Sequence, residues 1–242
     1  MKTIVKELSE IMTDGFKIPA PWRARVLVND DNMTYLVWNE NTREGLFVDP
    51  VAGDLDLQLS EAAKIPNTRW IAVIDTHTHA DHISNAGELA AKLTAPLIMH
   101  ANAPTKLVHL RVSRDGLLPT AGGPLRFLVT PGHTHDSITP IWGPFIFGGD
   151  TLLYGETGRD DLPTGDPRAH YESLQKIKVN VGSEFILLPG HDMNGGRASS
   201  WKTQLQEFPA LSQNYDEFYA DSGSWTGPAP KKLRESLFVN FK

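Results

Sequence analysis

Four apolar runs of strand length in this chain each end in a turn that carries histidine or aspartate. The first run, Trp70–Asp75, is followed by His77-Thr78-His79-Ala80-Asp81-His82, which holds three imidazoles and one carboxylate. Imidazole and carboxylate are the usual ligands of zinc and iron, and alternate residues of an extended segment can enter one cavity. Three later runs end in the same manner, at His133, Asp150 and His191. Four such clusters predict a metalloenzyme.

The six-residue cluster indicates a metal site because its histidines would be costly to bury without one. A lone histidine beside a strand is usually a core or surface residue. Three of them packed together would each need a buried hydrogen-bond partner. We therefore predict that His77 and His79 bind metal. Asp81 and His82 are predicted to bind metal as well, or to act beside it as acid–base groups.

The three later clusters each place a glycine directly before the polar residue, in Gly132-His133, Gly149-Asp150 and Gly190-His191. A glycine gives a tight exit from a strand and directs the next side chain outward. A carboxylate at Asp150 could instead cap a helix, but residues 151–154 do not resemble a helix start. All three polar residues join the predicted metal ligands. We expect His100, His109 and His170 to be structural. His135 and Asp136 are close enough to His133 to reach the mouth of the cavity, although a solvated loop is favoured for them.

The composition excludes several classes of protein. The chain has 242 residues, a formal net charge of -6 and no cysteine. The acidic balance argues against a nucleic-acid binder, and no apolar stretch approaches the roughly 18 residues of a membrane span. Without cysteine, any metal must be bound through nitrogen and oxygen. Charged residues return too early at the N-terminus for a signal peptide. The lack of cysteine makes the cytoplasm the expected location, although it also permits an oxidising compartment.

Length and pattern favour a single domain over 1–242, with 208–242 as a C-terminal extension packed on it. Apolar runs bounded by turn residues recur as in strands, and helical spacing falls between the later runs. The implied α/β architecture is two sheets with helices outside them. The predicted strands are 25–29, 34–38, 45–48, 70–75, 96–99, 125–129, 145–147 and 184–188. The predicted helices are 85–93, capped by Ser84, 167–178 and 198–207, and residues 222–230 are expected to be irregular.

The pattern His-x-His-x-Asp-His, followed by separate His, Asp and His after strands, resembles the metallo-β-lactamase superfamily. The resemblance implies an αββα sandwich of two mixed sheets flanked by helices, with the metals at one edge between the sheets. It also implies one set of metal-site residues: His77, His79, Asp81, His82, His133, Asp150 and His191.

Finer motifs are similar to those of the persulfide dioxygenases within that superfamily. They are Gly158-Arg159-Asp160-Asp161-Leu162, His191-Asp192-Met193-Asn194-Gly195 and the tail from Phe208. This resemblance implies a single Fe(II) held by His77, His133 and Asp150. Two histidines and one carboxylate leave open positions on iron for a substrate sulfur and O2.

The substrate implied by this resemblance is glutathione persulfide, oxidised by O2 to sulfite and glutathione. Arg159 and Tyr171 resemble the family's glutathione contacts in position, and a guanidinium can bind a carboxylate in two places. Each residue has a plainer alternative. Arg159 could pair with Asp160 or Asp161 on a solvated loop, and Tyr171 could belong to the apolar face of a helix.

Two other functions stay open at this point. The same residues could hold two zinc or manganese ions bridged by Asp150, as in glyoxalase II-like hydrolases, where a metal-bound hydroxide attacks a thioester or lactone. A non-catalytic metal-dependent binding or sensing protein would have no need for open metal positions. Nuclease members of the superfamily carry an extra domain and basic surfaces that this chain lacks. The oligomeric state, monomer or homodimer, also stays open.

Overall fold

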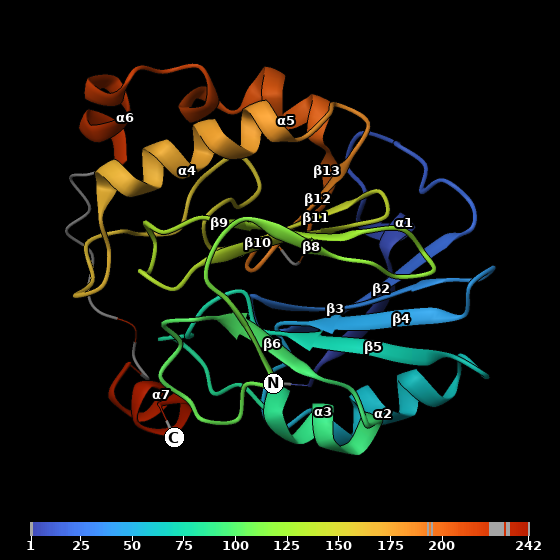
Figure 1. Ribbon diagram of the computed structural model, residues 1–242. Coiled ribbons are helices and arrows are strands. Elements are labelled where there is room, and N and C mark those ends of the chain that lie inside the picture. Colours follow the sequence, from blue (N-terminus) through green and yellow to red (C-terminus); the bar gives the residue numbers. More distant parts are fainter. Residues whose placement is uncertain (1, 193, 195, 223–229, 231–232, 242) are drawn as a thin grey trace.

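Two β-sheets stacked face to face form the centre of the protein, and helices cover their outer faces (Figure 1). The computed structural model describes residues 2–192, 194, 196–222, 230 and 233–241. The first sheet has seven strands in the order β1-β2-β3-β4-β5-β6-β7, and the second has six in the order β13-β12-β11-β10-β9-β8. Each sheet contains both parallel and antiparallel pairs. The predicted αββα sandwich is confirmed.

The strands and helices have the following bounds in the described residues. The first sheet is built from β1 (Ile4–Glu7), β2 (Trp22–Asn29), β3 (Asn32–Asn39), β4 (Glu44–Val48), β5 (Arg69–Ile74), β6 (Leu97–His100) and β7 (Leu110–Val112). The second is built from β8 (Gly116–Leu118), β9 (Leu125–Val129), β10 (Ile138–Trp142), β11 (Phe145–Gly149), β12 (Ile186–Pro189) and β13 (Ser199–Ser200). The helices are α1 (Leu8–Ile11), α2 (Leu55–Ala63), α3 (Ala86–Leu93), α4 (Pro167–Asn180), α5 (Trp201–Glu207), η1 (Pro209–Leu211), α6 (Tyr215–Ser222) and α7 (Leu233–Asn240).

The core between the sheets is made by alternate residues of each strand. Successive side chains of a strand point to opposite faces, so Leu46 and Val48 of β4 enter the central cluster while Phe47 packs outward under α2 and α3. In the second sheet Phe147 enters the same central cluster, and Ile146 packs outward under α4 and α5. Strands buried on both faces read as continuous apolar runs, which is why the sequence showed them clearly.

One edge of the sandwich collects the carboxyl ends of strands from both sheets. Strands β9, β11 and β12 run in the same direction, and β4 and β5 are parallel. Backbone hydrogen bonds join the sheets at this edge, among them those from Ile138 N to Thr76 O at 2.8 Å and from Met33 N to Gly190 O at 2.9 Å. The polar turns that follow these strands are therefore brought together.

Two elements that the sequence did not predict have identifiable causes. The central strand β10 contains Pro140, which lacks a ladder donor and argues against a central strand. Its pairing with β11 begins only at Ile141. Helix α2 contains Leu55, Leu57 and Leu59, whose alternation is typical of a strand rather than a helix. Strands β1, β7, β8 and β13 are short and lie at or next to sheet edges.

The remaining predictions of local structure agree with the fold to within a few residues. Helix α4 continues two residues beyond the predicted end, and Ser84 Oγ accepts from Ala86 N at the start of α3. The irregular segment expected at 222–230 lies largely outside the described residues. No helix in the described part of the chain is long and apolar enough to cross a lipid bilayer. That 208–242 is an extension of one domain stays a prediction.

We predict that Phe147→Ala lowers the free energy of unfolding by about 3–5 kcal/mol, because it opens a cavity between the sheets. Phe147 is 1% exposed, with its ring centroid 6.2 Å from that of Tyr35. Urea denaturation of both proteins measures the difference. The control is Val179→Ala on the surface of α4, where the side chain is 78% exposed and a change within about 0.5 kcal/mol is expected. Equal effects of the two substitutions would contradict the assigned core.

Candidate metal centre

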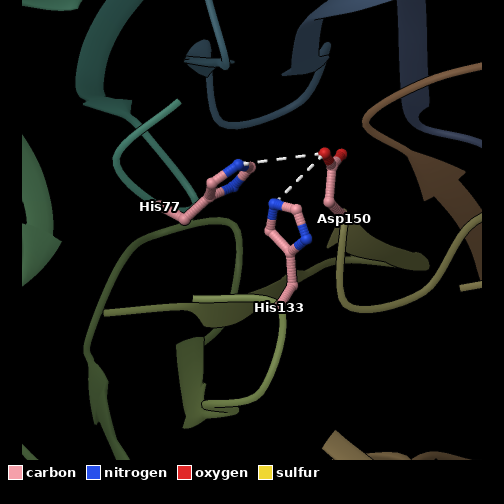
Figure 2. Close-up of side chains that lie close together, drawn as sticks. All are labelled: His77, His133 and Asp150. Atoms are coloured by element: carbon pink, nitrogen blue, oxygen red, sulfur yellow. Dashed lines mark ion pairs between the residues drawn. The ribbon is translucent and has the colours of Figure 1, made fainter. Parts of the chain in front are cut away.

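His77, His133 and Asp150 meet at the edge of the sandwich where their strands end. They follow β5, β9 and β11, and Figure 2 shows both imidazole rings directing a nitrogen toward the carboxylate. Asp150 Oδ2 lies 3.9 Å from His77 Nε2 and 3.5 Å from His133 Nε2. One potential ligand atom from each residue lies within 4.8 Å of the other two, and all three residues are buried. Three side chains from distant parts of the chain thus form one compact donor set.

Glycine is required in two of the turns that present these side chains. A Cβ on Gly132 would lie 2.2 Å from the Cα of His170, and one on Gly149 would lie 2.5 Å from Thr76 Oγ1. Gly149 also has a φ of +49°, which disfavours other residues. The turn before His133 can therefore press against α4, and the turn before Asp150 can press against the β5 side of the site.

Hydrogen bonds to the far nitrogen of each ring set which nitrogen faces Asp150. His133 Nδ1 lies 2.6 Å from Arg159 O, so it must donate, which leaves Nε2 with its lone pair. Thr76 Oγ1 donates to Asp49 Oδ2 at 2.9 Å and therefore accepts from His77 Nδ1 at 3.0 Å. Burial, followed by the neighbouring His79, lowers the pKa of His77 to about 3. Burial lowers the pKa of His133 as well. Both rings are thus neutral and present Nε2 to the site.

The donor set fits a divalent metal ion. Among the described residues, the buried atoms without a hydrogen-bond partner include His77 Nε2, both ring nitrogens of His79, His82 Nε2 and Asp150 Oδ1. An unpaired buried polar atom is costly in a folded protein. Nitrogen and oxygen donors of this kind bind zinc, iron or manganese. A metal ion would give these atoms a partner. His77, His133 and Asp150 are the residues best placed to hold it.

His79 lies beside His77 but faces two buried carboxylates. Its Nε2 is 3.3 Å from Asp49 Oδ1 and 3.9 Å from Asp75 Oδ1. Burial alone would lower the pKa of His79, but Asp49, together with Asp75, raises it to about 9. Burial also raises the pKa of Asp75 to about 7. With that pKa, His79 is a cationic imidazolium. Its ring groups with Asp49 and Asp75, or with Asp81 and His82, and not with the set of His77.

Asp49 and Asp75 are functional candidates that the sequence analysis did not single out. Both lie directly at the carboxyl end of an apolar strand, β4 and β5 respectively, and both are buried. That position is the same signal that identified His133 and Asp150. Asp49 also accepts from Thr76 N at 2.7 Å and so fixes the first residue of the turn that carries the histidines.

Asp81, His82 and His191 form a second set on the other side of Asp150. His82 Nδ1 donates to Asp81 Oδ2 at 2.9 Å, and His191 Nε2 lies 3.6 Å from that same oxygen and 3.3 Å from Asp150 Oδ2. Burial lowers the pKa of His191, but Asp150 and then Asp81 raise it to about 10. His79, Asp81 and His82 also lie close enough to share an ion. Asp150 thus stands between two possible metal positions.

The two predicted substrate residues are placed differently. Arg159 directs its guanidinium to Asp161, with Nε to Oδ1 at 2.6 Å and Nη2 to Oδ2 at 2.8 Å, while its carbonyl holds His133. Arg159 therefore lies beside the candidate metal centre. Tyr171 donates from its hydroxyl to Gln213 O at 3.2 Å, and its ring packs on Phe218 of α6. This geometry favours the alternative, that Tyr171 belongs to the apolar face of a helix, and its role in substrate binding stays untested.

The other histidines and the adjacent loop are largely as expected, with one correction. His170 is buried between Asp160 and Thr151 O, at 3.2 and 2.8 Å, and holds the loop of Arg159 against α4. His135 is exposed as predicted. The expectation of a solvated loop is wrong for Asp136, which is buried and accepts a hydrogen bond from Thr78 Oγ1. The turn at 134–137 folds inward and carries Asp136 against residues 75–84, which we call the histidine segment. His100 and His109 each accept a backbone N–H in ordinary structural contacts.

Comparison with known proteins identifies the family. The model of the metallo-beta-lactamase superfamily matches residues 30–208. Human mitochondrial persulfide dioxygenase ETHE1 is 25% identical over 213 residues, which cover 86% of this chain and 83% of that protein. A hydroxyacylglutathione hydrolase of Idiomarina loihiensis is 31% identical over 189 residues, covering 78% of this chain and 72% of the hydrolase. The crystal structure of ETHE1 from Myxococcus xanthus has a TM-score of 0.81 at 30% identity and covers 90% of this chain and 97% of that one.

These findings agree with the site described above. The relatives named are enzymes, which confirms the prediction of an enzyme, and the persulfide dioxygenases among them match the finer resemblance in the sequence. The family model spans the strands and turns from β3 to the end of α5, including every predicted metal residue. The chain therefore belongs to the metallo-β-lactamase superfamily.

Proposed function

We propose that the protein is an Fe(II)-dependent persulfide dioxygenase that converts glutathione persulfide, O2 and water into glutathione and sulfite. The observation that carries the proposal is the grouping of His77, His133 and Asp150 without His79. A set of two histidines and one carboxylate is typical of mononuclear non-haem iron oxygenases. In a binuclear site, His79 would be expected to join His77 and His133, whereas its Nε2 faces Asp49 here.

The comparisons support the same reading. Human ETHE1 is named a persulfide dioxygenase, and the ETHE1 structure from Myxococcus xanthus matches at 30% identity over 90% of this chain. Bound iron would supply coordination of the substrate sulfur and activation of O2. The three protein ligands would leave positions open for both. The location in the cytoplasm stays a prediction. Whether the protein is a monomer or a homodimer stays open.

The surrounding residues have roles that follow from their contacts. Arg159 O and the Thr76–Asp49 pair orient the two histidine ligands, as outer hydrogen-bond partners do in metal sites. His82 donates through Nδ1 to Asp81, which leaves its buried Nε2 as a proton acceptor. We assign Asp81 and His82 the acid–base role, taking up a proton from the water consumed in the reaction.

Arg159 is the proposed contact for a carboxylate of glutathione. Its guanidinium already forms a two-point contact with the carboxylate of Asp161, and this contact supports the proposal. A substrate carboxylate would replace Asp161 on one or both nitrogens.

A second candidate function is a glyoxalase II-like hydrolase with two zinc or manganese ions. The specific observation in its favour is that Asp81, His82 and His191 lie beside Asp150 and could hold a second ion. A hydroxyacylglutathione hydrolase is also among the relatives, at 31% identity. In both functions the substrate would be a glutathione-derived thiol compound.

We predict that anaerobically Fe(II)-loaded protein consumes O2 when glutathione persulfide is added and releases an equal amount of sulfite. An oxygen electrode and a sulfite assay measure the two. His133→Ala is the blank, since it removes one of the three ligands. Failure of protein shown to contain iron to take up O2 would contradict the proposal. Hydrolysis of hydroxyacyl-glutathione by zinc- or manganese-loaded protein would then favour the second function.

The metal content of two variants tests whether His77, and not His79, is a ligand of the iron. We expect the wild-type protein to hold one iron ion per chain and His77→Ala to lose at least about 10- to 100-fold in iron affinity, the range seen even for outer partners of a metal site. His79→Gln should retain iron at near wild-type stoichiometry, because His79 lies outside the set of three. Elemental analysis after dialysis measures both. Loss of iron from His79→Gln equal to that from His77→Ala would indicate that His79 is a ligand.

Substitution of Arg159 tests the substrate contact. Arg159→Ala should raise KM for glutathione persulfide about 10- to 100-fold, as expected for the loss of charge-assisted hydrogen bonds, with a smaller effect on kcat. Steady-state O2 uptake gives both constants. Tyr171→Phe is a matched comparison and should leave KM unchanged, because its hydroxyl binds Gln213 O. An unchanged KM in Arg159→Ala would remove the proposed contact.

A further inference from the structure

One side chain near the end of the described chain forms three hydrogen bonds with the histidine segment. Asn240 is the last residue of α7, which lies on the opposite side of the molecule from α6 (Figure 1). Its Nδ2 donates to His79 O and to His82 O, both at 2.9 Å. Its Oδ1 accepts from Ser84 N at 3.1 Å. A single amide thus binds backbone groups on both sides of Asp81.

The histidine segment depends on such partners because it has no regular secondary structure. Residues 75–83 form neither helix nor strand, so their backbone groups cannot be satisfied by a ladder, and buried backbone groups need partners. The end of the segment is tied to the β4 side by hydrogen bonds from Ala52 N to Ile83 O at 2.8 Å and from Asn85 N to Pro50 O at 3.1 Å. The contacts of Asn240 fix the stretch between these ties and β5.

The chemistry of the amide suits this position. An asparagine side chain offers two donors and one acceptor, and here it uses both kinds. Aspartate has the same shape and can still accept from Ser84 N, but it would place a carboxylate oxygen against two carbonyl oxygens. Alanine would remove all three contacts.

We propose that Asn240 is a positioning residue for the metal centre, which holds the backbone of His79–Ser84 so that Asp81 and His82 face Asp150. It touches no ligand atom and acts through the main chain. The inference rests on the proposed metal centre, and it makes docking of α7 and metal binding mutually dependent, since a ligand and a conformational contact that favour one state strengthen each other.

The first test uses metal-free full-length protein and hydrogen–deuterium exchange of the peptide that spans Ser84. Asn240→Ala should speed exchange there roughly fivefold or more, because the amide loses its acceptor. Asn240→Asp should keep the protection of Ser84. Asn180→Ala is the matched control, since Asn180 Nδ2 only donates to Lys176 O on α4. Unchanged exchange in Asn240→Ala would overturn the inference whether or not the protein binds metal.

The second test measures binding of Co(II), whose visible absorption reports the geometry of its ligands. Both Asn240→Ala and Asn240→Asp should raise the Kd for Co(II) about 10- to 100-fold and change the absorption spectrum, as for other outer partners of metal sites. Asn180→Ala should match the wild type. A fall in Tm of both Asn240 variants with wild-type Co(II) affinity and spectrum would show that α7 only stabilises the fold, and would overturn the inference. Neither readout requires dioxygenase activity, so failure of that activity alone leaves this result intact.

Discussion

The apolar contact between the inner faces of the two sheets determines where every functional side chain lies. Strand β11 is buried along its whole length, and so are the last three residues of β5. A shift of β11 by one residue would exchange Phe147, which packs between the sheets, with Ile146, which packs under α4 and α5. The registers of these strands are thereby fixed, and so are the turns that follow them. His77, His133 and Asp150 owe their proximity to this packing, because they follow three different strands and are separated by long stretches of sequence.

Within that frame, a second level of contacts decides how each side chain is turned. The hydrogen bonds that His133 donates to Arg159 O, and that His77 donates to Thr76 Oγ1 beside Asp49, select the tautomer of the two histidines. The carboxylates Asp49 and Asp75 select a different, protonated form of His79. Two histidines separated by one residue thus have different chemistry. Their immediate surroundings, more than their spacing, distinguish a three-ligand site from a larger one.

The sequence was informative wherever a single residue type follows a strongly apolar strand. That pattern predicted the two-sheet fold and the residues at its edge, including Asp150, whose alternative as a helix cap depended on the residues after it. It was uninformative where three-dimensional contacts decide. Asp136 is buried by a turn that folds inward, Tyr171 faces α6 through the rotation of α4, and β10 forms despite Pro140. Asn240 carries no local signal, since its partners lie more than half the chain away.

The separation of Asn240 from its partners has a consequence for synthesis of the protein. Translation is vectorial, and Asn240 is added 161 residues after His79. The histidine segment therefore emerges from the ribosome, and can meet metal ions, long before its last tether exists. An ion captured at that stage would be held by a segment without its final tether. On the proposed role of Asn240, the metal centre would reach its final shape only when α7 has docked, and the order of chain elongation would then bear on which ion it acquires.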